Sequence, residues 1–248
     1  MQTLASYNLK GGVGKTATAV NLAYLAAASG RPTLLWDLDP QGAAGWYLGV
    51  EPGLEEKPRR LLKGKAPLGR EVRATGHPHL DLLPADRALR HLDLRLDELG
   101  GRSRLAELLA PFAERYALVV LDCPPSSSRL AENVLAAANA VLAPLIPTPL
   151  SLRAWEQMLD QFAGSRRVLH RLWPFFTMVD RRRGLHRRWS DDPAQVVPGA
   201  LRLWVPYASE VERMGLTRRP LEQFAPRSPA AHAYRGLWRE VQRRLGGL

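Results

Sequence analysis

Residues 10–16 have the composition of a phosphate-binding loop, Lys-Gly-Gly-Val-Gly-Lys-Thr. Glycines allow the backbone to curl so that its N–H groups point at one anion, and the N-terminus of a following helix adds a positive dipole end. Lys15 can reach the outer phosphates of a nucleotide, and the Thr16 hydroxyl can bind Mg²⁺. These residue types at this spacing therefore predict a site for a nucleotide and its magnesium ion.

The loop departs from the usual phosphate-loop pattern just before its glycines. That pattern has a glycine five positions before Gly14, where this chain has Leu9. A lysine, Lys10, stands directly before the glycines instead. A solvated lysine at a loop edge is the plain interpretation of Lys10, but a cation in this position can also neutralise phosphate charge.

Two aspartates follow apolar runs that indicate buried strands. Asp39 comes after residues 33–36, and Asp122 comes after residues 117–121. Ligands of an open parallel sheet bind outside the carboxyl ends of its strands, so both carboxylates are expected near the phosphates. Asp122 is predicted to hold Mg²⁺ through its water shell, and Asp39 to orient an attacking water, with a further water-mediated contact to Mg²⁺. An aspartate after a strand is more often a turn or cap residue, but three motifs in this order favour nucleotide binding.

Short apolar runs alternate with helical patterns along the chain. The predicted strands cover residues 3–7, 33–36, 80–83, 117–121, 140–146, 174–179 and 201–205. Helical spacing covers residues 16–29, 89–99, 105–112, 130–138, 152–169 and about 229–245. The alternation predicts an α/β fold with one doubly wound, mostly parallel sheet flanked by helices. No internal repeat or linker is visible in the sequence, so we expect a single domain over residues 1–248.

The charge of the chain is unevenly distributed. The formal net charge is +11, and residues 151–248 hold 18 basic and 9 acidic residues. This C-terminal part is therefore predicted to carry a basic surface for a polyanion such as nucleic acid or an anionic membrane. The single cysteine, Cys123, excludes an internal disulfide and indicates a reducing cytosol. No apolar run approaches the ~20 residues needed to span a membrane, so stable membrane insertion is not expected.

The motifs resemble those of the ParA group of the ParA/MinD ATPases. The specific matches are the deviant phosphate loop (deviant Walker A) at residues 10–16, Asp-x-Asp-Pro-Gln-Gly at 37–42 and Asp-x-Pro-Pro at 122–125. Weaker matches at residues 80–85, 177–180 and 225–231 extend the resemblance over nearly the whole chain. The resemblance implies a P-loop NTPase fold and an ATPase with ATP and Mg²⁺ as cofactors. Hydrolysis to ADP and phosphate is then expected to be slow and stimulated by DNA and a partner protein.

The resemblance also implies roles for individual residues. Lys10 is expected to reach across the interface of an ATP-dependent homodimer to the nucleotide of the other subunit. Lys10, Lys15 and Asp39 are then the catalytic residues. The implied nucleotide-binding residues are Lys10, Gly11, Gly12, Val13, Gly14, Lys15, Thr16, Ala17, Pro206 and Tyr207. The implied magnesium contacts are Thr16, Asp122 and, through water, Asp39.

Two positions depart from the family pattern. Ala17 stands where the family usually has a second Thr or Ser, so a hydroxyl that could touch the α-phosphate is missing and weaker nucleotide binding is expected. Tyr207, after Pro206, stands where the family often has an arginine near the adenine. Its ring could stack on adenine or could pack in the core. The preference for adenine over guanine rests on the resemblance alone.

The resemblance further implies non-specific DNA binding through arginines of the C-terminal part. The candidates are Arg202, Arg227, Arg218 and Arg219. A ParB-like centromere-binding or adaptor protein is the expected partner. The predicted function is chromosome or plasmid segregation, or cargo positioning on the nucleoid, in the cytoplasm.

Two alternatives remain open at the level of sequence. The first is a MinD-like ATPase that cycles on a membrane, because residues 229–245 form a basic amphipathic helix that could lie on anionic lipid. The same apolar spacing, with Leu237, Trp238 and Val241 on one face, more often marks a helix packed on its own core. The second alternative is a nucleotide-switched scaffold that hydrolyses little ATP.

Overall fold

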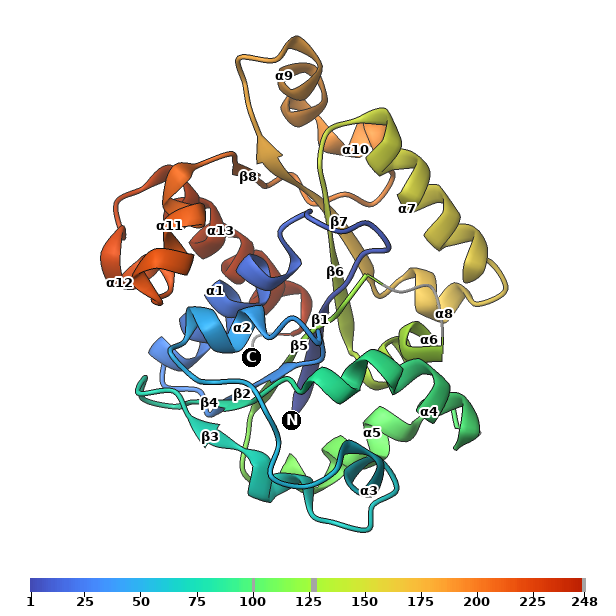
Figure 1. Cartoon of the computed structure of the whole chain (residues 1–248). Helices are drawn as coiled ribbons and strands as arrows, with labels where there is room; N and C mark the ends of the chain where they lie inside the picture. Colours follow the sequence, from blue (N-terminus) through green and yellow to red (C-terminus); the bar gives the residue numbers. More distant parts are fainter. Residues whose placement is uncertain (100, 126–128, 247–248) are drawn as a thin grey trace.

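An eight-stranded sheet forms the middle layer of the molecule (Figure 1). The computed structural model describes residues 1–99, 101–125 and 129–246. The strands are β1 Gln2–Ser6, β2 Thr33–Asp37, β3 Arg73–Ala74, β4 Leu80–Leu83, β5 Leu118–Asp122, β6 Ala140–Leu145, β7 Leu172–Val179 and β8 Trp204–Pro206. Their order is β3-β4-β2-β5-β1-β6-β7-β8. Only the β3–β4 pair is antiparallel, so the predicted doubly wound, mostly parallel sheet is confirmed.

Helices cover both faces of the sheet. One face carries α1 Lys15–Ala28, α2 Ala43–Tyr47, α11 Ser209–Thr217, α12 Leu221–Phe224 and α13 Pro229–Arg244. The other carries α3 Pro58–Leu62, α4 Leu92–Glu98, α5 Arg104–Leu109, α6 Arg129–Ala137, α7 Pro149–Gln161, α8 Arg166–Leu169, α9 Gly184–Asp191 and α10 Pro193–Val196. Single 3₁₀ turns lie at Leu68–Glu71, Arg87–His91 and Ala110–Phe112. Because both faces are covered, strands such as β2 and β5 are buried along their whole length and read as continuous apolar runs.

The C-terminal helix α13 belongs to the core. Leu237, Trp238 and Val241 are each at most 5% exposed and pack with α1 and the sheet. The core alternative for this helix is therefore confirmed, and its apolar face is not available to lie on lipid. No helix in the described ranges has the length and apolar character needed to cross a bilayer.

The carboxyl ends of β1, β2 and β5 lie side by side. Ser6 and Asp37 are both register partners of Asp122. The loops that follow these three strands contain the three motifs singled out in the sequence, at residues 10–16, 37–42 and 122–125. The parallel arrangement therefore brings three segments that are distant in the sequence to one edge of the sheet.

Candidate functional site

The turn between β1 and α1 has a backbone that two glycines make possible. Gly12 and Gly14 have φ angles of 69° and 87°, in the left-handed region that favours glycine. Gly14 is also the N-cap of α1, and a Cβ at this position would lie 3.2 Å from Thr177 Oγ1. A side chain at Gly14 would therefore strain the backbone and press on β7.

The loop presents unused hydrogen-bond donors. None of the backbone N–H groups of residues 11–17 makes a hydrogen bond of good geometry to the described part of the chain. The N-terminus of α1, a 14-residue helix, has no side-chain cap. Free N–H groups and the positive end of a helix dipole together form an anion site. The geometry fits the phosphate-binding role predicted for this loop, including Val13 and Ala17, which are both buried.

Lys15 is held inside the loop. Its side chain is buried, and Nζ donates to the carbonyl oxygen of Lys10 at 3.0 Å. Burial lowers the pKa of the Lys15 ammonium, while the nearby Asp122 and Asp39 oppose that shift. A desolvated ammonium with one protein acceptor gains much from an anionic ligand. The Lys15 ammonium is therefore well placed to bind an anionic phosphate group.

Asp122, the last residue of β5, is a buried carboxyl without a hydrogen-bond partner. Neither of its oxygens has one among the described residues. Burial raises the pKa of Asp122 well above its ordinary value, and the charge of Asp37 adds to the shift. The Thr16 hydroxyl and the Lys15 ammonium lie close enough to oppose it. A buried carboxylate without hydrogen-bond partners is stable only if a nearby cation balances its charge or a proton neutralises it.

The donor set here fits Mg²⁺. The unpartnered oxygens of Asp122 and the adjacent Thr16 hydroxyl are oxygen ligands, which Mg²⁺ prefers. No group of three or more His, Cys, Asp or Glu side chains in the described ranges could hold a metal by itself. An ion here would therefore complete its shell with phosphate oxygens and water, as nucleotide sites commonly do.

Proton release should accompany nucleotide binding at this site. Because burial raises the pKa of Asp122 and a bound cation would lower it again, binding of Mg²⁺·ATP is expected to release protons from this carboxyl, and the affinity for Mg²⁺·ATP is expected to rise with pH. Calorimetry in two buffers of different ionisation enthalpy measures the release. The Asp122→Asn variant, which cannot ionise, should lose it. Proton uptake by the unmodified protein would contradict this assignment.

Asp37, for which the sequence predicts no separate role, organises the second loop. Its Oδ1 accepts from Asp39 N at 3.1 Å, and its Oδ2 accepts from Ala44 N and Gly45 N at 3.1 and 3.3 Å. Burial raises the pKa of Asp37 to about 7, against the effect of these N–H donors. The side chain thus fixes both the start of α2 and the backbone of Asp39. The position of Asp37 inside its strand gave no signal of this in the sequence.

Asp39 and Lys10 are the more accessible members of the site. The half-buried carboxylate of Asp39 accepts from Gln41 N at 3.0 Å. The Lys10 side chain is also half-buried, and its backbone N donates to Asn8 Oδ1 at 2.9 Å. The Lys10 ammonium has no partner within the described residues. The Lys10 ammonium and the second carboxylate oxygen of Asp39 therefore remain available for a ligand or a second subunit.

The far end of the loop meets β8 at a shallow pocket. This cavity of about 50 Å³ is lined by residues that include Gly14, Ala17, Met178, Pro206, Tyr207 and Tyr234. Tyr207 is 56% exposed and its hydroxyl donates to Glu212 at 2.9 Å, so the ring is not packed in the core. The predicted pair Pro206–Tyr207 thus lies beside the loop. Met178 and Tyr234, which come from β7 and α13, were not predicted from the sequence.

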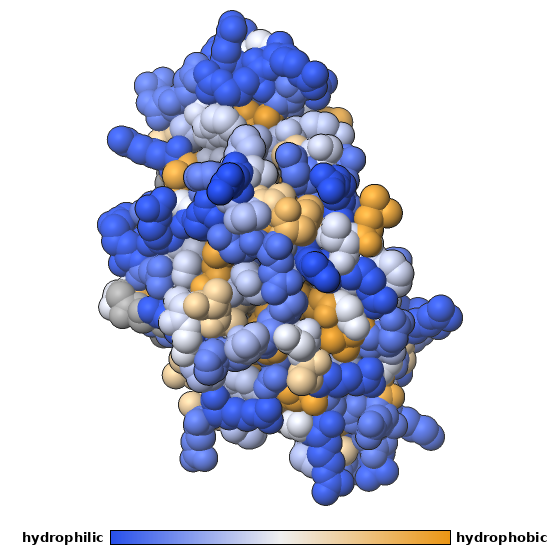
Figure 2. Space-filling model, turned by 90° about the vertical axis from the view of Figure 1, so that its left-hand side faces the viewer, coloured by the Kyte–Doolittle hydropathy of each residue, from blue (hydrophilic) through white to orange (hydrophobic). Residues whose placement is uncertain are grey.

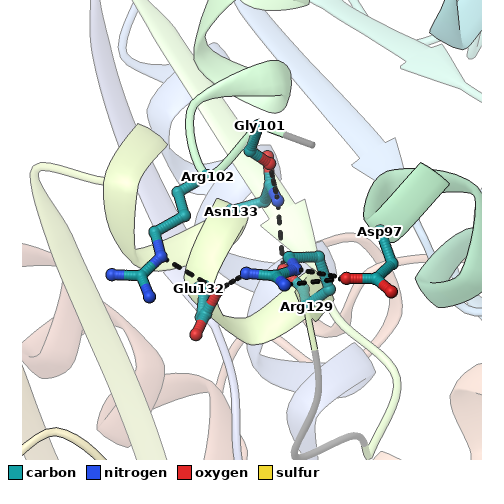
Figure 3. A network of polar contacts seen from close by, with 6 residues as sticks. All are labelled: Asp97, Gly101, Arg102, Arg129, Glu132 and Asn133. Carbon is teal, nitrogen blue, oxygen red and sulfur yellow. Dashed lines mark hydrogen bonds and ion pairs between the residues drawn. The ribbon is translucent and has the colours of Figure 1, made fainter. Parts of the chain in front are cut away.

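A network of polar contacts surrounds the first turns of α6. Arg129 donates to Asp97 at 2.7 Å and to Glu132 at 2.6 Å, and Asn133 donates to Gly101 O at 3.0 Å (Figure 3). A larger cavity of about 640 Å³ lies beside this network, between α6, α7 and α8. None of the residues that line this cavity belongs to the loop at residues 10–16.

The four candidate DNA-binding arginines differ in their surroundings. Arg202, Arg219 and Arg227 are exposed and form no ion pair with any described residue. They lie before β8, after α11 and between α12 and α13, respectively. The guanidinium of Arg218 is instead engaged by Glu51 and Trp46. Three of the four side chains are thus free to meet a polyanion.

The chain is similar to known partitioning proteins over its full length. The sequence profile of a family described as an AAA domain matches residues 1–170. The chromosome-partitioning ATPase Soj of Thermus thermophilus is 37% identical over 99% of this chain and 97% of that protein. The chromosome partitioning protein ParA of Caulobacter vibrioides is 36% identical over 77% of this chain and 75% of that protein.

A solved structure of a protein with a different name shares the fold. Cobyrinic acid a,c-diamide synthase from Mycobacterium smegmatis, with bound ATP analogue and magnesium, superposes with a TM-score of 0.83 at 28% identity, over 99% of this chain and 96% of that one. The predicted resemblance is thereby confirmed: the chain belongs to the ParA group of the ParA/MinD partitioning ATPases.

Proposed function

We propose that this chain is an ATP-dependent dimerising ATPase that binds DNA without sequence preference. It would act in chromosome or plasmid segregation, or position cargo on the nucleoid. The observation that carries the proposal is one juxtaposition: the free N–H groups of residues 11–17 lie beside the buried, unpartnered carboxyl of Asp122. The first is a site for phosphate and the second for a cation. Family membership supports the choice of ATP.

ATP binding is proposed to use the loop and the edge of β8. The N–H groups of the loop and Lys15 hold the phosphates, while Tyr207 offers an exposed ring on which adenine can stack. Thr16 and, through water, Asp122 would hold Mg²⁺, whose charge would offset the negative charge of the outer phosphates. Because Ala17 provides no hydroxyl, binding should be weaker than in relatives with Thr or Ser there.

Lys10 is proposed to act on the other subunit. One ammonium and one divalent ion leave part of the γ-phosphate charge uncompensated, and a second cation would neutralise it. The Lys10 side chain sits at the loop rim without a partner in the described part of its own chain. Two chains facing each other across their nucleotides would each supply one Lys10. Dimerisation would then depend on ATP.

Asp39 is proposed to orient the attacking water. Asp37 fixes its backbone, so its carboxylate stays near the loop edge while one oxygen binds Gln41 N. Asp39→Ala should lower the rate of phosphate release by at least about 100-fold while leaving ATP-dependent dimers intact. Phosphate release and scattering with ATP measure the two effects. Normal turnover would remove Asp39 from the proposed reaction.

DNA binding is proposed to use the exposed arginines of the C-terminal part. The face with α11 and α12 consists mainly of hydrophilic residues with hydrophobic residues among them, and hydrophilic residues also cover the upper end near α9 (Figure 2). A dimer doubles this basic surface, so its affinity for DNA exceeds that of a monomer by avidity. Hydrolysis would separate the subunits and release DNA. A ParB-like partner is proposed to stimulate hydrolysis.

Replacing the three free arginines tests this surface. The triple variant Arg202→Ala/Arg219→Ala/Arg227→Ala should bind DNA more weakly with ATP present. The slope of log affinity against log salt should become shallower by about 0.9 for each DNA phosphate that the variant no longer neutralises. Filter binding at several salt concentrations measures it. Arg59→Ala, an exposed arginine on α3, is the control and should bind as the unmodified protein does.

Phosphate release with and without DNA separates the ATPase from a nucleotide-switched scaffold. We expect slow phosphate release that becomes faster when DNA and the partner protein are added.

Co-sedimentation with DNA or with anionic liposomes separates nucleoid binding from membrane cycling. Binding to liposomes but not to DNA would contradict the proposal that DNA is the polyanion bound by the basic surface. The burial of α13 supports DNA, because the helix that could lie on lipid is part of the core.

A further inference from the structure

Helix α2, which follows the Asp39 loop, is short and has few apolar anchors of its own. It spans only Ala43–Tyr47; its fully buried members are Ala44 and Gly45, and Tyr47 packs half-buried against the core. Small residues bury little apolar surface, and a five-residue helix is not stable by itself. Contacts from outside the helix must therefore hold it in place. Asp37 supplies them at its start.

Arg218 supplies contacts that hold the C-terminal end of α2. Its guanidinium stacks over the Trp46 ring at 4.2 Å, its Nε donates to Trp46 O at 3.2 Å, and it donates to Glu51 Oε1 at 3.0 Å. The Trp46 indole in turn donates to Gly215 O at 2.8 Å. These contacts join residues 167–172 positions apart in the chain. A planar guanidinium that stacks and donates at once is a specific use of arginine.

The same contacts reach the Asp39 loop by a second route. Glu51, the ion-pair partner of Arg218, is followed by Pro52. Pro52 Cβ lies 3.3 Å from the position that a Cβ at Gly42 would take, so the two residues are closely packed. Gly42 is the N-cap of α2, and its N–H donates to Asp39 O at 2.9 Å. Arg218 is therefore linked to the loop indirectly by two routes, through Trp46 in α2 and through Glu51 and Pro52.

Helix α11 connects these contacts to the base end of the nucleotide site. It begins at Ser209, directly after Tyr207 and Ala208, and Val211 and Glu212 line the same pocket as Tyr207. It ends at Thr217 and is capped by Arg218, whose φ of 51° places it in the left-handed region. One helix thus runs from the pocket beside the phosphate loop to the end of α2.

We propose that Arg218 is a positioning residue for hydrolysis: it clamps α2 and thereby holds Asp39 where the attacking water must be. This inference rests on the proposed ATPase function. It gives Arg218 a role different from DNA binding, although it lies in the basic C-terminal part. The side chain acts through Trp46, Glu51 and Pro52, and not by contact with nucleotide.

Arg218→Ala tests the clamp with two readouts. Amide exchange of residues 38–50 should become at least about 10-fold faster, because the end of α2 loses its outside contacts. The kcat for ATP without DNA should fall by about 10-fold while KM stays within about twofold, because a misplaced group slows the reaction without weakening binding. Arg213→Ala is the matched control. It removes another arginine of α11, which lies over Phe224 and not on α2, and should change neither readout.

Two conservative variants guard against simple misfolding. Arg218→Lys keeps a cation for Glu51 but loses the planar stack, so both readouts should fall between those of alanine and the unmodified protein. Trp46→Phe keeps a ring for stacking but loses the donor to Gly215, and should also be intermediate. Lysine as defective as alanine would assign the effect to the contacts of the guanidinium with Trp46, the stack and the hydrogen bond to Trp46 O, which still supports the clamp.

The outcomes separate the clamp from the proposed function. Unchanged exchange in Arg218→Ala would overturn the clamp, and faster exchange with unchanged kcat would overturn its role in positioning Asp39. A loss of DNA affinity without either change would make Arg218 an ordinary DNA-binding arginine. Absence of phosphate release by the unmodified protein would instead overturn the proposed ATPase, and amide exchange would still decide whether Arg218 holds α2.

Discussion

Lys15→Ala is expected to weaken ATP binding by at least about 100-fold, the largest effect of any single substitution in the loop. The Lys15 ammonium is buried and donates only to Lys10 O among the described residues, so phosphate would be its natural second acceptor. Its removal takes away charge-assisted hydrogen bonds to the outer phosphates. Titration with a fluorescent ATP analogue in the presence of Mg²⁺ measures the affinity.

The matched control for Lys15→Ala is Lys57→Ala. Lys57 is an exposed lysine before α3, on the face of the sheet opposite α1. Its loss should leave the affinity for ATP unchanged. If the Lys15 variant bound ATP as tightly as the control, the loop would not be the phosphate site.

Lys10→Ala is expected to abolish ATP-dependent dimers while leaving ATP binding by the monomer within about threefold of normal. Truncating one partner of a desolvated ion pair typically weakens an interface by about 2–5 kcal/mol, and a symmetric dimer loses the pair twice. In the single chain, the Lys10 side chain has no partner within the described residues that its removal would leave unsatisfied. The Lys15 and Lys10 variants should therefore separate ATP binding from ATP-dependent dimerisation.

A tenfold loss of ATP affinity in the Lys10 variant, with its dimers intact, would give Lys10 a role within its own subunit. Lys10→Arg is the informative companion. It retains the positive charge with a different geometry, so partial recovery of the dimer would show that charge is the main requirement.

The fold and the phosphate loop were predictable from the sequence because their signals are local. Strands buried on both faces read as continuous apolar runs, so β2, β4 and β5 were located to within a residue or two. The glycines before Lys15 fix a backbone that few other residues can adopt. The parallel sheet then places Asp39 and Asp122 beside the loop, as expected for residues at the carboxyl ends of its strands.

The remaining features depend on contacts between distant segments. Strand β3 has two residues and pairs antiparallel at the sheet edge, so it leaves no periodic pattern. Helix α2 is held by Asp37 and Arg218, and neither contact is visible in the small residues of the helix itself. Tyr234 lines the pocket because its helix, α13, packs against α1. Such pairings follow from the tertiary structure and not from spacing.

One measurement tests the central claim, that ATP bound at Lys15 is converted by Lys10 into a change of assembly. It is the molar mass by light scattering of Asp39→Ala protein, with Lys10 intact or replaced by alanine, in Mg²⁺·ATP and in Mg²⁺·ADP. We predict twice the monomer mass only for the variant with Lys10 in ATP, and a monomer in the other three samples. A dimer in ATP without Lys10, or a monomer throughout, would contradict the claim.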